Sequence, residues 1–153
     1  MAYTTSQAQA GRGTQLSIGP VVGTATPVYV PVFELKDVPF KGPEWDLVDV
    51  TNMNSAGFSE SLLTIQKWPK LTLSGNYVEA DPGQTAMQAA QATGGLYMFT
   101  LEYPKTATQT TAGKTISFNA YVLNYGTDLA VEKEQALTCD LQPSGAFTVT
   151  AGS

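Results

Sequence analysis

Short segments with residue types that could do chemistry are the first features to examine. Residues 108–115, TQTTAGKT, end in the Gly-Lys-Thr of a phosphate-binding loop, in which backbone amides and a lysine hold phosphate groups. The motif's first glycine is replaced by Thr108, and a helix must follow directly so that its N-terminal amides reach the phosphates. Residues 116–122, ISFNAYV, alternate instead like a strand. We therefore expect Lys114 to begin a strand after a hairpin loop.

Two further patterns resemble hydrolase sites. Residues 57–61, GFSES, resemble the nucleophile elbow G-x-S-x-G, but Ser61 replaces the last glycine and the chain has no histidine to act as base. Glycosidases use two carboxylates, and neighbouring carboxylates occur here at Asp46/Asp49, Glu79/Asp81 and Glu132/Glu134. Spacing along the chain does not set the distance across a cleft, so we interpret these as solvated strand ends and one helix N-cap.

The composition excludes several classes of site. The chain has 153 residues, a formal net charge of −5, one cysteine, Cys139, and one arginine, Arg12. A lone cysteine without histidine forms neither an intrachain disulfide nor the usual tetrahedral zinc site. Serine–histidine and cysteine–histidine catalysis need an imidazole, and binding to phosphates needs a basic stripe. We expect no enzyme activity, no metal and no cofactor.

The chain is also poor in charge. Asp, Glu, Lys and Arg make up 14% of the residues, against about 25% in an average soluble domain. Neutral polar side chains replace them, and a neighbour can cover such a surface with little loss of charge hydration. This composition fits a subunit of an assembly, but an ordinary charge-poor domain fits it equally well.

The hydrophobic pattern predicts a mainly β fold, a β-sandwich or barrel-like subunit with one short flanking α-helix. Asp81 suits an N-cap, Pro82 the first helical position and Gly94 the left-handed stop of a helix over 81–95. Period-two alternation, apolar β-branched residues and turn signals predict the strands. These cover residues 15–18, 28–35, 46–51, 70–79, 96–103, 114–125, 128–141 and 146–151.

The remaining segments set the domain organisation. Residues 1–14 are small and polar and predict a mobile N-terminal arm. Residues 52–66 show no clear period and predict a long loop that contains Phe58, Leu62 and Leu63. A single β-rich domain then spans residues 15–153. No run approaches the roughly 18 apolar residues of a membrane span, and the N-terminus lacks the apolar stretch of a signal peptide.

The predicted strand 128–141 has two contrasting faces. Strict alternation places acidic residues on one face with alanine and threonine, and apolar residues on the other. An ordinary half-buried strand explains this pattern, and so does a surface that repels a polyanion. The acidic set is Asp128, Glu132, Glu134 and Asp140, and the apolar set is Leu129, Val131, Leu137, Cys139 and Leu141.

The order of several motifs resembles a known family. FELKDVPFKGPEWDLVDVT (33–51) is followed by a loop with Glu60 and by KLTLSGNYVEADPGQTAM (70–87). A helix ending in TGG, then FTLEYP (99–104) and LQPSGAFTVTAG (141–152), complete the series. In this order and spacing the chain resembles the major tail proteins of long-tailed bacteriophages, which are the subunits of the tail tube.

The resemblance implies a structural role in a virion tail. Subunits of that family form hexameric rings that stack into a tube through which the genome leaves, and strands of neighbouring subunits join into a continuous inner barrel. The implied partners are other copies of the chain, tape measure and tail-end proteins, and double-stranded DNA that passes without specific binding. The implied location is the virion tail, with assembly in the host cytoplasm.

The resemblance also assigns roles to residues. The loop 52–66 corresponds to the part that reaches between rings, with Phe58, Leu62 and Leu63 as buried anchors. A lumen that repels phosphates lets DNA slide, so we expect Glu132 and Glu134 to face it. Two alternatives remain: a non-catalytic carbohydrate-binding or adhesin-like β-sandwich that uses Trp45 and Trp68 for stacking, and a tail-end protein that stops at one ring.

Overall fold

A computed structural model describes residues 13–153 of the chain, so the predicted arm 1–14 lies outside the described residues except for Gly13 and Thr14. The described residues form one helix and ten strands. The prediction of a mainly β fold with one short helix is confirmed. The elements are β1 (Gln15–Val21), β2 (Val30–Val32), β3 (Leu35–Asp37), β4 (Glu44–Asp49), β5 (Ser61–Lys67), β6 (Leu71–Asn76), α1 (Pro82–Thr93), β7 (Leu96–Glu102), β8 (Thr115–Asp128), β9 (Ala136–Pro143) and β10 (Thr148–Thr150).

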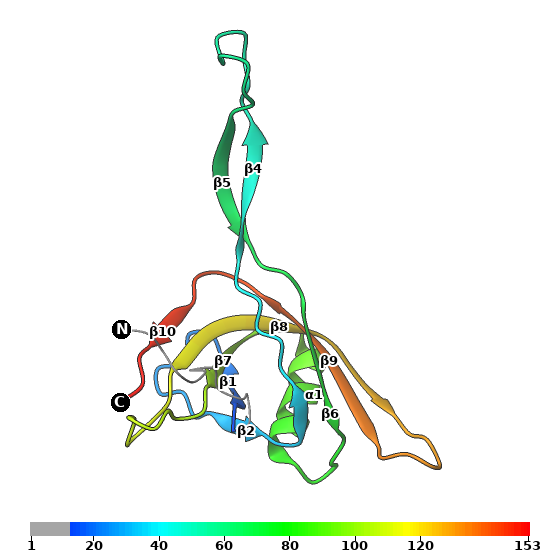
Figure 1. Ribbon diagram of the computed structural model, residues 1–153. Helices are drawn as coiled ribbons and strands as arrows, with labels where there is room; N and C mark the ends of the chain where they lie inside the picture. The colour runs from blue at the N-terminus through cyan, green and yellow to red at the C-terminus, as the bar shows by residue number, and fades with distance from the viewer. Residues whose placement is uncertain (1–12) are drawn as a thin grey trace.

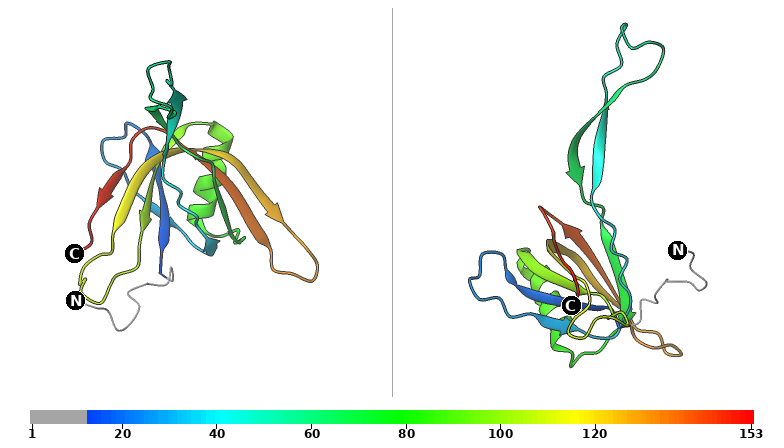
Figure 2. Two further views of the ribbon diagram at one scale, coloured as in Figure 1. Left: turned by 45° about the horizontal axis from the view of Figure 1, so that its top comes forward. Right: turned by 60° about the vertical axis from the view of Figure 1, so that its left-hand side comes forward.

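The strands form one large sheet and one separate hairpin. The large sheet is antiparallel, with strand order β2-β1-β7-β8-β9-β6-β3, and β10 pairs with the start of β8. This sheet is strongly curved and partly encloses α1, whereas the hairpin β4–β5 projects away from the body (Figures 1 and 2). The sheet and helix thus form a platform, and the hairpin extends from it.

The hydrophobic core lies between the curved sheet and α1. Alternate residues of β8 and β9 point into it, and Met87 and Ala90 of α1 close it. Each large apolar side chain buried in this way contributes roughly 1.5–3 kcal/mol to folding. The core residues of the two long strands are Ile116, Phe118, Ala120, Val122, Leu137, Cys139 and Leu141.

The start of α1 fastens the two ends of the sheet together. The Asp81 carboxylate caps the helix by accepting from Gln84 N at 3.3 Å, and it also accepts from Phe33 N at 3.1 Å. Gln84 is buried, accepts from Val78 N at 2.9 Å, and donates to the carbonyls of Phe33 and Asn76. Gly94 has φ 70° and ends the helix. The predicted helix and its caps are confirmed.

The predicted strand 28–35 is wrong as a continuous element. Glu34 adopts φ 63°, a left-handed conformation that turns the chain between β2 and β3. Its carbonyl accepts from Asn76 N at 2.8 Å, so β6 holds the turn in place. Pattern alone did not reveal this turn because the side chains alternate through it.

Two other boundaries also differ from expectation. Residues 61–67 form strand β5 rather than part of a loop, and they pair with β4. The strand predicted over 128–141 is wrong over its first half, because residues 129–135 form the exposed turn between β8 and β9. Over its second half Leu137, Cys139 and Leu141 are buried as predicted.

Candidate assembly interface

The β4–β5 hairpin exposes apolar side chains over its whole length. In β4 five of six residues are exposed, and in β5 all seven are exposed. An isolated two-stranded hairpin is marginally stable in water, and exposed apolar surface of this extent marks a contact site. Its large exposed apolar residues are Trp45, Leu47, Val48, Val50, Met53, Phe58, Leu62, Leu63 and Ile65.

Both faces of the hairpin are apolar. Leu47 pairs with Leu63 on one face, and Val48 pairs with Leu62 on the other. Ile65 lies on the same face as Leu63, because side chains two positions apart share a face of a strand. A ribbon that buried only one face would be polar on the other. This hairpin is therefore suited to lie between two partner surfaces.

Polar contacts order the tip, residues 50–60, although its apolar residues face solvent. Thr51 Oγ1 accepts from Glu60 N at 2.8 Å, and Ser55 Oγ donates to Glu60 Oε2 at 2.7 Å. Val50 N donates to Glu60 O at 2.9 Å. Met53 is fully exposed and Phe58 is 79% exposed. The tip thus presents apolar groups on a defined backbone, which lowers the entropy lost when a partner binds.

The structure brings the three predicted anchors into one element. Phe58 lies in the tip, whereas Leu62 and Leu63 lie next to each other on β5 and point to opposite faces. The sequence prediction placed Ile65 in the loop but did not count it, or the apolar residues of β4, among the anchors. The signal that could have found them is two short apolar runs, DLVD and LLTI, separated by a segment rich in Asn, Ser and Gly.

An aromatic cluster attaches the hairpin to the body. Trp68, which directly follows β5, stacks edge-on against Phe147 at a centroid distance of 5.4 Å and against Phe40 at 5.9 Å. The ring centroids of Phe40 and the core residue Phe118 are 5.6 Å apart. Trp68 Nε1 donates to Gly145 O at 2.8 Å, and Gln142 Nε2 donates to Trp68 O at 3.0 Å. The root of the hairpin is therefore rigidly held.

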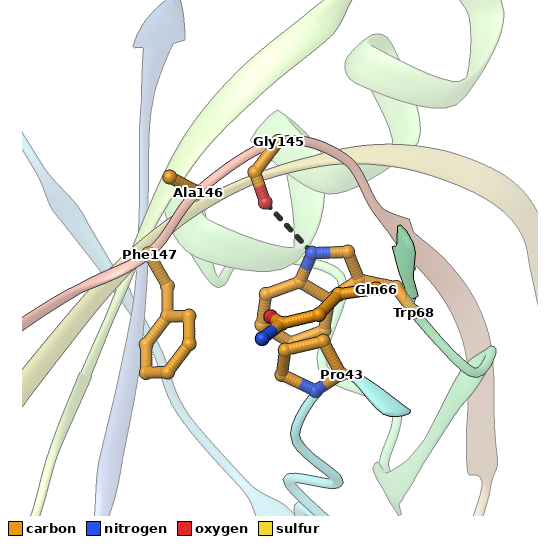
Figure 3. A pocket seen from close by; sticks show the side chains of 6 residues that line it. All are labelled: Pro43, Gln66, Trp68, Gly145, Ala146 and Phe147. Carbon is orange, nitrogen blue, oxygen red and sulfur yellow. Dashed lines mark hydrogen bonds between the residues drawn. The ribbon is translucent and has the colours of Figure 1, made fainter. Parts of the chain in front are cut away.

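A pocket of about 350 Å³ opens beside this cluster (Figure 3). The Trp68 indole, the Phe147 ring and Pro43 form its apolar walls, and Gln66 also lines it. Gly145 and Ala146, between β9 and β10, complete the lining. None of the lining residues is charged, so the pocket suits an apolar group.

Solved structures of tails and tubes share this architecture. A chain in the tail of an empty gene transfer agent particle has a TM-score of 0.71 and 17% identity, over 94% of this chain and all of that chain. The SPP1 tail tube protein has a TM-score of 0.65 and 13% identity, over 92% of this chain and 77% of that chain. This chain has the tail tube fold.

A third match extends the comparison to a baseplate. A chain of the anti-feeding prophage baseplate has a TM-score of 0.68 and 10% identity, over 96% of this chain and 97% of that chain. No protein-family model and no curated protein sequence matches the chain. The likeness is therefore one of backbone architecture, and it confirms the resemblance inferred from the order of the sequence motifs.

Within this tail tube fold, the two predicted lumen residues lie elsewhere than on a strand. Glu132 and Glu134 are exposed in the β8–β9 turn, with Lys133 between them. Glu134 forms an ion pair with Lys36 of β3. The lumen prediction rested on a strand face whose charges were all acidic. That premise is wrong, because the chain leaves the strand at Leu129 and the turn brings acidic and basic side chains together.

The segments that resembled catalytic motifs lie at the start of a strand and in the hairpin tip. Thr115, directly after Lys114, begins strand β8, and the Lys114 ammonium lies 5.4 Å from the Tyr103 ring centre. Ser59 lies in the exposed hairpin tip. Burial raises the pKa of the Cys139 thiol to about 12. In residues 13–153 there is no group of three His, Cys, Asp or Glu side chains that could hold a metal, and no helix long and apolar enough to cross a membrane.

Proposed function

We propose that this protein is a structural virion subunit that assembles into stacked hexameric rings and forms the tail tube, the conduit for genome ejection. The observation that carries the proposal is the β4–β5 hairpin, which projects from a tail tube fold with both faces apolar and exposed. A monomer gains nothing from such an element, whereas stacked rings cover it. Phe58, Leu62 and Leu63 are its inter-ring contacts.

A free strand edge supports the joining of subunits within a ring. β7 pairs with β8 only as far as Tyr121, whereas β9 follows the other side of β8 to Asp128. Among the described strands, none pairs with the β7 side of residues 122–128, and an open edge of this length invites a strand of a neighbouring copy. The sixfold symmetry of the gene transfer agent tail favours six copies per ring.

Electrostatics supports a passive conduit rather than a DNA-binding protein. The chain carries a net charge of −5 and few charges of either sign, so phosphates find few cationic groups on which to pause. We place Glu132 and Glu134 at the lumen, supported by their exposed positions in the β8–β9 turn. A reconstruction of the tube in which both carboxylates lie on the outer wall would show this placement to be wrong.

The proposed partners and location follow from the tube role. The subunit binds other copies of itself, contacts tape measure and tail-end proteins, and lets double-stranded DNA pass without specific binding. It assembles in the host cytoplasm and ends in the virion tail. The role is structural and non-enzymatic, and it requires no cofactor.

Electron microscopy of the purified protein tests the function directly. We expect hollow tubes, from the wild-type chain alone or after addition of a nucleating tail-end complex. Phe58→Asp keeps the monomer folded and abolishes the tubes, while the matched substitution Val28→Asp, at an exposed site outside the hairpin, leaves them intact. A stable monomer that binds glycans would favour the adhesin-like alternative, and isolated rings would favour a tail-end protein.

A further inference from the structure

The pocket beside Trp68 has the properties of a receptor for one apolar side chain. It holds about 350 Å³, its walls come from Trp68, Phe147 and Pro43, and no charged residue lines it. The hydrogen bond from Trp68 Nε1 to Gly145 O fixes the indole that forms its main wall. Aromatic anchors that fill preformed pockets supply most of the binding free energy in many interfaces.

The same chain carries a group that suits this pocket. Phe58 in the hairpin tip is 79% exposed, and the hydrogen bonds around Glu60 order the backbone beside it. Figures 1 and 2 show the tip pointing away from the body, so it cannot reach the pocket at its own root. The Phe58 ring can therefore fill this pocket only in a second copy of the chain.

Charge favours the same pairing of tip and root. Residues 47–66 of the hairpin contain two carboxylates, Asp49 and Glu60, and no cation. The flanking segments 41–46 and 67–70 contain three lysines, of which Lys67 and Lys70 form ion pairs with Asp46 and Asp140. Lys41 is exposed and takes part in none of the ion pairs found within residues 13–153. The distal part of one hairpin, with Asp49 and Glu60, is therefore complementary to the Lys41 ammonium at the root of another.

We propose that Phe58 of one copy inserts into the Pro43–Trp68–Phe147 pocket at the hairpin root of the next copy. The inference rests on the proposed tube function and names the receptor for the hairpin tip. The contact joins two different surfaces, and such a head-to-tail interface extends into an open assembly when its rotation does not close. Because Phe58 and Trp68 are ten positions apart in the chain and β5 lies between them, extended geometry separates successive copies by at most roughly 35 Å.

Cysteine cross-linking in assembled protein tests this contact. The double variant Ser59→Cys/Ala146→Cys keeps Phe58 and places one thiol beside it in the tip and one at the pocket. Under mild oxidation we expect a ladder of dimers, trimers and longer products on a non-reducing gel. The native thiol of Cys139 is fully buried and does not contribute. The matched pair Ser59→Cys/Val28→Cys, with its second thiol at another exposed site, gives no ladder.

The outcomes separate this inference from the proposed function. Tubes without a ladder in the first double variant, or with equal ladders in both, overturn the pocket assignment alone. Wild-type protein that never forms tubes overturns the proposed function as well. As a second measure, Phe58→Ala raises the concentration needed for assembly at least about tenfold, whereas Val28→Ala does not change it. An unchanged threshold in Phe58→Ala contradicts the proposal.

Discussion

Leu47 and Leu63 are directly opposed partners across the β4–β5 hairpin, yet they are 61% and 53% exposed. Paired leucines of this kind normally lie beneath another layer of structure. In this molecule that layer is missing from the monomer, and the opposite face repeats the arrangement with Val48 and Leu62. Each of the two faces of the hairpin therefore supplies one half of an interface with a partner surface.

Charge placed on either face of the hairpin should block assembly without unfolding the subunit. We expect Leu62→Asp and Leu63→Asp each to abolish tubes, because a carboxylate would be buried without a partner in the interface. The melting temperature of the monomer should change by no more than about 2 °C, since neither side chain contributes to the core. Circular dichroism and negative-stain microscopy check the two results, with Val28→Asp as control. Tubes formed by either variant would show that its face stays exposed.

Loss of the buried Gln84 amide should destabilise the subunit. Gln84 accepts one backbone hydrogen bond and donates two, linking α1 to the β2–β3 turn and to β6. In Gln84→Ala these three part-buried backbone groups lose their partners, and we expect the free energy of unfolding to fall by about 2–4 kcal/mol. Urea unfolding measures the change. Gln88→Ala, one turn along on the exposed side of the same helix, should cost less than about 0.5 kcal/mol.

Ionisation of Cys139 should destabilise the fold in alkali. Burial raises the pKa of this thiol from 9.0 to about 12, so the unfolded chain releases its proton at a lower pH than the folded chain. The stabilisation is complete below about pH 9 and is lost as the pH rises towards 12, at roughly 1.4 kcal/mol per pH unit. Urea unfolding at about pH 8 and about pH 10 measures the slope. Cys139→Ala should lack this component, and an identical slope in both proteins would contradict the assignment.

Removal of Lys67 should be visible at Asp46. The hydrogen bond and the charge of the Lys67 ammonium, 2.8 Å from the carboxylate, lower the pKa of Asp46. In Lys67→Gln that pKa should return towards its ordinary value, as measured by NMR titration of the carboxyl carbon. The pair is exposed, so the thermal stability of the monomer should hardly change. An Asp46 titration that does not move would mean that the pair is open in solution.

The helix and the core faces of two strands, β6 and β9, could be predicted from local patterns. Asp81, Pro82 and Gly94 mark the ends of α1 through requirements that depend on a few neighbouring residues. The core faces of β6 and β9 were predictable because each strand buries one side only, which gives clear alternation.

The hairpin and the β8–β9 turn escaped prediction for physical reasons. Leu62 and Leu63 are adjacent apolar residues on opposite faces, so a strand with two apolar faces shows no period of two. In residues 129–135 the alternation continues by coincidence, although the chain has already left the sheet. The pocket beside Trp68 depends on contacts between residues 43, 68 and 147, which no local pattern encodes.

The separation of the hairpin from the core has an evolutionary consequence. Residues 44–67 join the body through a fixed aromatic root, and almost none of their apolar side chains take part in folding. Selection can therefore alter which neighbours a subunit accepts while leaving its foldability alone. Exchanging this hairpin between relatives should therefore exchange the partners with which each subunit assembles and leave the fold of the body unchanged.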